Sequence, residues 1–365
     1  MTTLFLCGDV MLGRGIDQIR ARHNRPDLHE PSVHDARDYV ALAERASGPI
    51  PRAVEPAYVW GDALAELDRV APDVRIINLE TAVTSQETHW PDKTIHYRMH
   101  PANVDALTAA RIDVCALANN HVLDYGPSGL RETVESLRSA GIETAGAGCD
   151  LAEARQPAIV ALPNGRRVIV FSLGCANSGV FEDWAVTPGR CGVDYLADLS
   201  DSSAGRVVSR VEAVAHRGDV IVVSIHWGDN WGYEVPDSFV RFAHRLIDGG
   251  VAIVHGHSSH HPRPIEIYHN RLVLYGCGDL LTDYEGITGY EEFRPSLALL
   301  YFVTLADDGA LAELRMAPFR VHRFQAVATD ASDVRWIRDR LAHESLRFGT
   351  GIELVDDETR LAARG

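Results

Sequence analysis

Five short apolar runs in this sequence each end in a cluster of polar residues, and this repeated pattern limits the folds open to the chain. A short continuous apolar run is typical of a buried strand in a parallel sheet. In open α/β sheets, ligands bind at the carboxyl ends of such strands. The runs are residues 4–7 before Gly8-Asp9, 76–77 before Asn78-Leu79-Glu80, 114–117 before Asn119-Asn120-His121, 220–225 before His226-Trp227-Gly228 and 251–254 before His255-Gly256-His257. We therefore expect five strand ends to supply one shared site.

The stretches between and after these runs predict helices and hairpins. Amphipathic spacing predicts helices over residues 127–140, 203–216, 238–248 and 331–346. Paired apolar runs around short turn sequences predict hairpins over residues 157–172, 265–275 and 297–316. Parallel strand–helix units combined with hairpins favour an α/β fold with mixed β-sheets, arranged as a four-layer α/β/β/α sandwich.

The length of 365 residues exceeds the usual size of a single hydrophobic core. We expect one large sandwich domain over residues 1–321 and a C-terminal helical extension over residues 322–365 that packs on it. Residues 17–57 carry five prolines and little periodicity. Such a long segment near the first strand end is either a substrate-facing loop or an irregular surface segment, and the sequence leaves both readings open.

The acidic composition makes some classes of partner unfavourable. The chain has 35 Lys and Arg residues against 51 Asp and Glu residues, which gives a formal net charge of −16. This charge repels nucleic acid backbones and anionic lipid surfaces, so we expect neither as a partner. No run of about 18 apolar residues forms a membrane anchor, and the first residues lack the basic region of a signal peptide, so we expect a cytoplasmic protein. A small molecule is the partner class that remains, and the oligomeric state is left open.

A dense histidine cluster points to metal binding. Residues 255–261 contain four of the 17 histidines of the chain. A buried imidazole needs a hydrogen-bond partner or a metal ion, and packing alone does not explain four at one strand end. His226 follows the preceding apolar run, while Asp9, Glu80 and Asn120 follow earlier ones. Because nitrogen and carboxylate oxygen together suit Mn, Zn or Fe and suit Ca poorly, we expect one or two divalent transition metals as the cofactor.

The polar clusters, taken in order, resemble the successive motifs of the CapA family. The matching segments are Gly8-Asp9-Val10-Met11-Leu12-Gly13-Arg14, Asn78-Leu79-Glu80-Thr81, Asn119-Asn120-His121-Val122-Leu123-Asp124-Tyr125-Gly126, His226-Trp227-Gly228 and Gly256-His257-Ser258-Ser259-His260. That family contains proteins of capsule and poly-γ-glutamate synthesis and is built on the calcineurin-like metallophosphoesterase fold. The resemblance runs from Leu4 to about residue 300. It implies that the sandwich is of the metallophosphoesterase type.

The resemblance also implies a role for each matching residue. Asp9 would hold one metal and Glu80 would bridge two. Asn120 would ligate the second metal, and His121 would contact the leaving group as the general acid. His226, His257 and His260 complete the implied ligand set. Asp124, three residues after His121, either orients the His121 imidazole during catalysis or caps the following helix.

Departures from the pattern of that fold bear on the number of metals. The metallophosphoesterase signature has a histidine two residues after the first aspartate, where this chain has Met11. The bridging residue is Glu80 instead of an aspartate, and two residues rather than one separate His257 from His260. One metal and two metals therefore both stay open. Asp279 stands where CapA-like proteins tend to have asparagine, and it is either an additional carboxylate near the metal or a turn residue.

Two cationic side chains near the predicted strand ends are candidates for binding a small anionic substrate. Arg14 follows Asp9 by five residues, where its guanidinium could bind a phosphate or carboxylate through two parallel hydrogen bonds, or could simply lie at a helix end. Lys93 lies in a cationic and aromatic loop after Glu80 and could bind the same anion, although a solvated loop lysine is the commoner case. Bound cations would offset the charges of Asp9 and Glu80, so an anionic substrate is compatible with the acidic chain.

These observations favour a metal-dependent hydrolase that cleaves a phosphate ester or a related anionic substrate with a metal-activated water. Two alternatives stay open. An enzyme that forms or cleaves amide bonds of glutamyl type, in capsule or secondary-metabolite biosynthesis, would use the same centre. A non-catalytic binding or scaffold module would keep the fold with a vestigial metal site, and the absence of the signature histidine at Met11 supports that reading.

Overall fold

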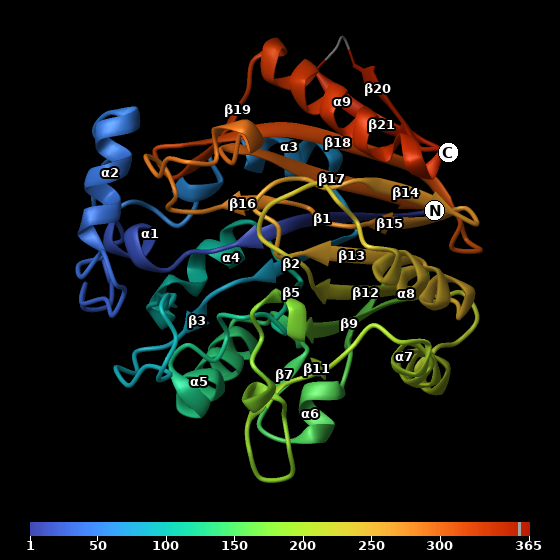
Figure 1. The fold of residues 1–365 in the computed structure, drawn as a ribbon, viewed down its shortest axis with the longest axis horizontal. Coiled ribbons are helices and arrows are strands. Elements are labelled where there is room, and N and C mark those ends of the chain that lie inside the picture. Colours follow the sequence, from blue (N-terminus) through green and yellow to red (C-terminus); the bar gives the residue numbers. More distant parts are fainter. Residues whose placement is uncertain (357–358) are drawn as a thin grey trace.

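Apolar side chains alternate along β1 (Thr2–Val10) between two hydrophobic layers. Leu4 and Leu6 face one layer and Phe5 faces the other, because successive side chains of a strand point to opposite faces of its sheet. The computed structural model describes residues 1–356 and 359–365. In it, the side chains of β12 (Val220–His226) alternate between the hydrophobic layer that contains Leu4 and a third hydrophobic layer. Three apolar layers separate four layers of secondary structure, so the predicted four-layer α/β/β/α sandwich is confirmed (Figure 1).

The larger sheet is mixed and has ten strands in the described part of the chain. Besides β1 these are β2 (Val74–Leu79), β5 (Val114–Ala116), β6 (Glu143–Ala145), β16 (Asp279–Leu281), β17 (Leu297–Leu305), β18 (Leu311–His322), β19 (Gln325–Ala328), β20 (Gly351–Val355) and β21 (Arg360–Arg364). The order is β20-β21-β18-β17-β1-β2-β5-β6, with β16 paired to β1 and β19 paired to β18. β1, β2, β5 and β6 run parallel, and β17 joins β1 antiparallel.

The smaller sheet stacks on the larger one through the layer of Leu4. Its strands are β8 (Ala158–Ala161), β9 (Arg167–Cys175), β11 (Tyr195–Leu196), β12, β13 (Ile253–His257), β14 (Ile265–Tyr268) and β15 (Arg271–Leu274). The order is β11-β9-β12-β13-β15-β14, with β8 paired to β9. The predicted hairpins are confirmed, because β8–β9, β14–β15 and β17–β18 are antiparallel pairs.

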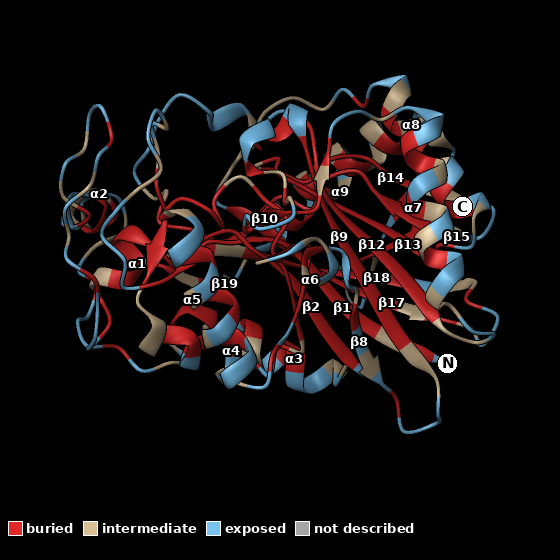
Figure 2. Ribbon diagram, turned by 90° about the horizontal axis from the view of Figure 1, so that it is seen from below, coloured by how far each residue is buried: buried red, intermediate tan, exposed pale blue. Residues whose placement is uncertain are grey.

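Helices surround the two sheets. They are α1 (Arg14–Gln18), α2 (Arg37–Ser47), α3 (Ala63–Val70), α4 (Asp105–Ala109), α5 (Gly126–Ser139), α6 (Leu151–Arg155), α7 (Asp201–Val214), α8 (Asp237–Asp248) and α9 (Ala331–Ser345). Leu67, Leu107 and Leu130 place α3, α4 and α5 on the larger sheet, while Val207 and Phe242 place α7 and α8 on the smaller one. Figure 2 shows the consequence: the strands are buried, and the helices expose their outer sides. Within the described residues, no helix has both the length and the apolar character needed to span a membrane.

The loops that follow the strand ends carry short additional elements. Two small sheets, β3 (Ala82–Val83) with β4 (Arg98–Met99) and β7 (Ala147–Gly148) with β10 (Gly192–Val193), lie among them. The segment over residues 17–57 is not irregular throughout, since it contains α2, which buries Tyr39, Val40 and Ala43. Figure 1 shows α1 and α2 beyond the carboxyl end of β1.

The predicted helical extension over residues 322–365 is only partly helical. α9 matches the predicted helix, but β19, β20 and β21 are strands of the larger sheet. Ile352, Leu361 and Ala363 face the same apolar layer as Leu4, and β21 pairs with a β18 edge that would otherwise leave backbone groups unpaired. The segment therefore completes the sheet, while α9 packs against β14 and β20. A domain boundary after residue 321 stays a prediction.

An ion pair between α3 and β21 should make stability depend on pH. Glu66 accepts paired hydrogen bonds from Arg360 (2.7 and 2.8 Å) and from Arg69 (2.8 and 2.9 Å). Although burial opposes the shift, these bonds lower the pKa of Glu66 to about 2. A carboxyl with a lowered folded-state pKa stabilises the fold above its unfolded pKa and loses that contribution as pH falls toward the folded value. Glu66→Gln should therefore cost about 1–3 kcal/mol in the free energy of unfolding at pH 7.

Urea unfolding of both proteins at pH 7 and at successively lower pH checks this expectation. The difference in unfolding free energy should shrink as pH falls below about 4.5, the range in which the unfolded carboxyl takes up its proton. The control is Glu344→Gln, which removes the i,i+4 pair with Arg340 on α9 and should cost about 0.5 kcal/mol or less. A Glu66→Gln difference that is independent of pH would contradict the assignment.

Candidate metal centre

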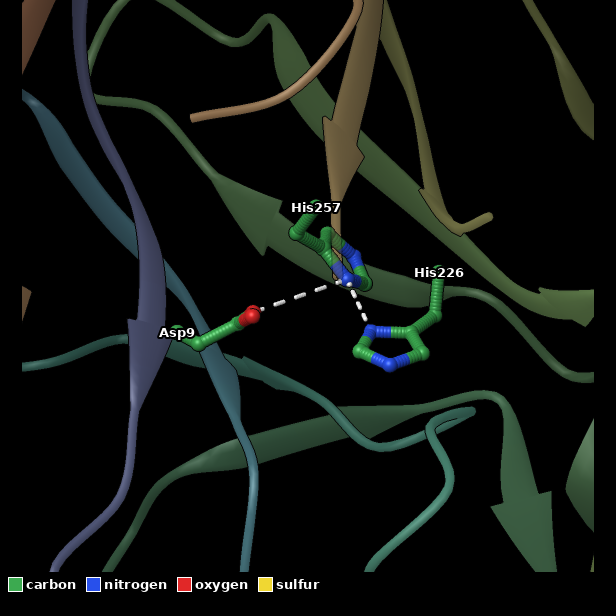
Figure 3. Close-up of side chains that lie close together, drawn as sticks. All are labelled: Asp9, His226 and His257. Atoms are coloured by element: carbon green, nitrogen blue, oxygen red, sulfur yellow. Dashed lines mark hydrogen bonds and ion pairs between the residues drawn. The ribbon is translucent and has the colours of Figure 1, made fainter. Parts of the chain in front are cut away.

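The carboxyl ends of β1, β12 and β13 meet and bring three predicted ligands together. Asp9 lies near the end of β1, while His226 and His257 are the last residues of β12 and β13 and stand opposite each other in the parallel register. One ligand atom from each side chain lies within 4.8 Å of the others (Figure 3). In the described part of the chain, no other group of three or more His, Cys, Asp and Glu side chains has this spacing. Both sheets therefore contribute candidate ligands to the same site.

A chain of hydrogen bonds behind His257 fixes which of its nitrogens carries a hydrogen. His255 Nε2 lies 2.7 Å from the carbonyl oxygen of Cys7, which can only accept, so this nitrogen donates. Burial lowers the pKa of His255 to about 4, so its Nδ1 is unprotonated and accepts from the Ser224 hydroxyl (3.1 Å). Ser224 Oγ then accepts from His257 Nε2 (2.8 Å). His257 therefore has a lone pair on Nδ1, which lies 3.9 Å from Asp9 Oδ1.

His226 faces that lone pair directly. The Nδ1 atoms of His226 and His257 are 2.8 Å apart, and burial lowers the pKa of both imidazoles well below the usual range. His226 Nε2 is buried, lies 3.9 Å from Glu80 Oε1, and has no hydrogen-bond partner within the described residues. Converging neutral imidazoles with an unpartnered buried nitrogen fit a divalent transition metal better than they fit a network of protein hydrogen bonds alone.

Two buried carboxylates lie beside these imidazoles. Asp9 accepts from Asn78 Nδ2 at Oδ1 (2.7 Å) and from the backbone N–H of Ser258 at Oδ2 (3.2 Å). Burial and the charge of Asp279 raise the pKa of Asp9 to about 7. Burial and the charge of Asp9 raise the pKa of Glu80 well above its usual range. Neighbouring buried carboxylates repel each other when both are ionised, and a divalent cation between them would remove that cost.

Asn120 and His260, the other predicted ligands, come from the same edge of the sheets. Asn120 follows β5, and its amide oxygen is buried without a hydrogen-bond partner in the described part of the chain. That atom is a neutral oxygen of the kind that cations accept as a ligand. His260 follows β13, and its Nδ1 contacts Asp279 Oδ1 at 3.1 Å. His260 is outside the 4.8 Å group, and the ligand roles of Glu80, Asn120 and His260 stay predictions.

His121 and Asp124 are hydrogen-bonded to each other beside the carboxylates. His121 Nδ1 lies 2.7 Å from Asp124 Oδ2, and its Nε2 lies 3.7 Å from Glu80 Oε1. The ring of Tyr97 stacks on the imidazole with centroids 3.8 Å apart, and the backbone N–H of Tyr97 donates to Asp124 Oδ2 (2.6 Å). The alternative role of Asp124 as a helix cap is not realised, because Tyr125 is the N-cap residue of α5 and no side chain caps it. Asp124 instead orients His121.

Lys93 lies behind His121. Its side chain is only 9% exposed, so it is not a solvated loop lysine, which is one of the two predicted possibilities. Its ammonium donates to Asp124 Oδ1 and lies 2.9 Å from His121 Nδ1. One ring nitrogen cannot both donate to Asp124 and accept from Lys93. We assign the hydrogen on Nδ1 to the shorter contact with the carboxylate, the stronger acceptor. Burial and the charge of Lys93 lower the pKa of His121 well below its usual range, so the resting imidazole is neutral.

Arg14 is held in a buried ion network. Its guanidinium donates to Asp283 through Nε (3.2 Å) and Nη2 (2.6 Å) and to Glu30 through Nη1 (2.9 Å). The ring of Tyr39 lies 3.8 Å from the guanidinium carbon and that of Tyr97 lies 4.5 Å from it. Arg14 therefore ties α1 to the segments that carry Glu30 and Asp283, and the predicted contact with substrate would require it to break these bonds.

The sequence-based reasoning missed Ser224 and Tyr97 as parts of the site. Ser224 lies two residues before His226, and the period of two along a strand places both side chains on one face. That spacing is the signal that could have found it. Tyr97 has no such signal, because its contact with His121 depends on how the loop after Glu80 folds back.

Ser224→Ala tests the hydrogen-bond chain behind His257. The hydroxyl is the only link from His255 to His257 in that chain, so without it the hydrogen is free to move to His257 Nδ1, the nitrogen that faces the centre. We expect metal binding to weaken by about 10–100-fold, measured as a Kd by titration calorimetry with Mn²⁺ or Zn²⁺. The control Ser209→Ala, on the exposed side of α7, should leave the Kd unchanged. Equal Kd values for the Ser224→Ala variant and the parent would contradict the chain.

Comparison with known proteins places the chain in a family. The family described as bacterial capsule synthesis protein PGA_cap has a model that matches residues 3–284. The chain belongs to this family. The matched range contains every predicted ligand, from Asp9 to His260, and relatives bear the name CapA, so the resemblance of the motifs to CapA proteins is confirmed.

The names of individual relatives of this PGA_cap protein refer to the synthesis of polyglutamine or of PGA. A protein of Mycobacterium tuberculosis (strain H37Rv), named probable polyglutamine synthesis accessory protein, is 50% identical over 351 residues, which cover 96% of this chain and 92% of that protein. The PGA biosynthesis protein CapA of Bacillus subtilis (strain 168) is 25% identical over 316 residues, 86% of this chain and 70% of that protein. Among solved structures, a 5'-nucleotidase precursor of Thermus thermophilus gives a TM-score of 0.46 at 16% identity, covering 89% of this chain and 54% of that one.

Proposed function

We propose that this PGA_cap family member is a metal-dependent hydrolase that cleaves a phosphate ester or a related anionic substrate. The observation that carries the proposal is that the imidazoles of His226 and His257 lie against the buried carboxylates of Asp9 and Glu80. Beside them, His121 is hydrogen-bonded to Asp124. A binding module would need neither the fixed lone pair of His257 nor the Asp124–His121 pair. Their combination is the arrangement that hydrolytic chemistry requires.

The proposed ligands are Asp9, Glu80, Asn120, His226, His257 and His260. One or two divalent cations held there (Mn, Zn or Fe) would supply Lewis acidity, which lowers the pKa of a water molecule and offsets charge on a phosphoryl oxygen. The protein contributes fixed geometry, because the chain from Cys7 through His255 and Ser224 orients His257. Asn78 likewise holds Asp9. Side chains positioned in this way need little rearrangement during the reaction.

His121 takes up a proton from solvent at Nε2 and carries it to the leaving group. Its other nitrogen is bonded to Asp124, so uptake of a proton at Nε2 gives an imidazolium that the Asp124 carboxylate stabilises. Lys93 donates to the second oxygen of Asp124 and keeps that carboxylate ionised. Delivery of the proton to the departing oxygen returns His121 to its neutral resting state.

We propose that the rest of the substrate occupies a cavity that is connected to His260 through Tyr284. The ring of Tyr284 meets that of His260 edge-on, with centroids 5.2 Å apart, and Tyr284 also lines a cavity of about 520 Å³. Arg294 and Arg320 line the same cavity, although both are paired with Asp333. A substrate bound at the metal centre would extend along Tyr284 into this cavity.

A second candidate is cleavage of an amide bond of glutamyl type by the same residues. The names of the relatives, which refer to polyglutamine and PGA synthesis, favour it. The chemistry differs only in the bond attacked, since a cation that polarises a phosphoryl oxygen also polarises a carbonyl oxygen. His121 would then protonate a departing amine.

Hydrolysis of chromogenic substrates by the reconstituted protein tests the proposal. The metal-free protein is loaded separately with Mn²⁺, Zn²⁺ or Fe²⁺ and offered p-nitrophenyl phosphate, bis-p-nitrophenyl phosphate and γ-glutamyl-p-nitroanilide. Release from either phosphate that depends on the metal supports the phosphoesterase. Release from the anilide alone supports the amide hydrolase. Retained metal with no release from any of the three overturns both and favours the non-catalytic module.

A further inference from the structure

The first metal subsite lacks the ligand that the metallophosphoesterase signature places at position 11. Met11 is 1% exposed, and its thioether is a soft donor that hard divalent cations do not select. Its backbone N–H donates to Leu281 of β16 (2.8 Å). The strand beside position 11 is therefore β16, which begins with Asp279.

β16 runs parallel to β1 and places Asp279 next to Asp9. The two residues are paired in the register, and the backbone N–H of Asp9 donates to the carbonyl of Gly278 (2.9 Å). A Cβ at Gly8 would lie 1.5 Å from that carbonyl oxygen, so the close approach of the two strands requires glycine at this point. The sequence is thus adapted to bring a second carboxylate beside Asp9.

The Asp279 side chain has one oxygen committed and one without a partner. The residue is 2% exposed. Its Oδ1 contacts His260 Nδ1 (3.1 Å), whereas its Oδ2 is buried with no hydrogen-bond partner among the described residues. A buried carboxylate oxygen without a donor costs free energy unless a cation pairs with it. Asp9, itself buried, stands opposite on β1.

We propose that Asp279 is a metal ligand that replaces the missing histidine and completes a first subsite with Asp9, Glu80 and His260. The inference rests on the proposed metal centre and extends it to two ions. The second subsite would be that of His226, His257 and Asn120, with Glu80 shared between the two. Asp9 would lie at the boundary of the subsites, since it is also within 4.8 Å of His226 and His257. Because the first subsite has three carboxylates and one imidazole, it selects Mn²⁺ over softer ions, while the second, richer in imidazole, suits Zn²⁺ or Fe²⁺ as well.

The competing role for Asp279 is only to orient His260 through their hydrogen bond. Asp279→Asn separates the two roles, because the amide oxygen still accepts from His260 Nδ1 but the anionic oxygen is lost. As a ligand, Asp279 should be needed for uptake of the first-subsite ion. As an orienting residue, it should be replaceable by asparagine without loss of metal.

Mn²⁺ titration followed by calorimetry and by electron paramagnetic resonance tests the inference. We expect the parent protein to bind about two equivalents and give the signal of a spin-coupled pair, and Asp279→Asn to bind about one and give the six-line signal of an isolated ion. His226→Ala, the matched control, should instead weaken the other subsite. Thermal unfolding without metal checks that the Asp279→Asn variant folds.

The outcomes separate this inference from the proposed function. Unchanged stoichiometry and affinity in the Asp279→Asn variant overturn the role of Asp279 but leave the metal centre intact. Failure of the parent protein to take up any metal overturns the metal centre itself, and this inference with it. Loss of one equivalent, or at least a tenfold weaker first-subsite ion, in a folded variant supports it.

Discussion

Replacing His257 with alanine is expected to remove metal-dependent turnover and to weaken metal binding by more than about 100-fold. The loss of a hydrogen-bond partner behind a ligand costs about 10–100-fold in affinity, and this change removes the ligand itself. It also leaves Ser224 Oγ without its donor and His226 Nδ1 without the atom that lies 2.8 Å away. The measurement is metal content after dialysis, together with kcat on the substrate that the parent protein turns over.

The matched control for this variant is His343→Ala, an exposed histidine near the end of α9. It should retain full metal content and full turnover. Because alanine leaves a small buried cavity at position 257, the unfolding temperature of both metal-free proteins is compared as well. Full metal content in a folded His257→Ala protein would contradict the assignment of the centre, since the lone pair of His257 that faces Asp9 and His226 would then contribute nothing to metal binding.

Much of the centre could be predicted from the sequence because strand ends concentrate ligands. The apolar runs before Asp9, His226 and His257 are short and uninterrupted, and each is a strand. The strands extend beyond the runs, so these three residues lie within the carboxyl ends of the strands. Parallel pairing of β12 and β13 then fixes His226 beside His257 without any further information. No single apolar run shows that the two sheets meet at this point. That inference depended on several apolar runs all being followed by residues that can bind a metal.

The parts that could not be predicted depend on contacts between distant segments. Arg14 joins Glu30, from a loop without periodicity, to Asp283, which lies 269 residues after Arg14. The strands β20 and β21 have weak patterns. β21 becomes a strand because it pairs with the edge of β18, and β20 in turn pairs with β21. The orientation of His257 depends on the carbonyl oxygen of Cys7. Every residue has a backbone carbonyl, so the amino-acid sequence does not indicate which one accepts this hydrogen bond. Local patterns therefore located the ligands, whereas their orientation needed the fold.

His121→Ala should lower kcat by about 10²–10⁴-fold on a substrate with a poor leaving group and leave metal content unchanged. The imidazole supplies a proton to the departing atom, so its removal matters most where that atom is strongly basic. An alkyl phosphate ester, or an alkyl amide if amide cleavage is the activity, is therefore the substrate to measure. On the p-nitrophenyl or p-nitroanilide analogue, whose departing group is stable with little protonation, the loss should be much smaller, about tenfold or less.

The comparison of the two leaving groups makes this expectation specific to proton transfer. Loss of a substrate contact would raise KM or lower kcat by a similar factor for both substrates, and loss of folding would lower metal content as well. A conservative variant of the supporting residue, Asp124→Asn, should show the same dependence on the leaving group in weaker form, because the amide still accepts from His121 Nδ1 but no longer stabilises the imidazolium. Equal losses on both substrates for the His121→Ala variant would contradict its role as the acid. They would leave His121, stacked on Tyr97 beside Glu80, as a residue that shapes the site without donating a proton.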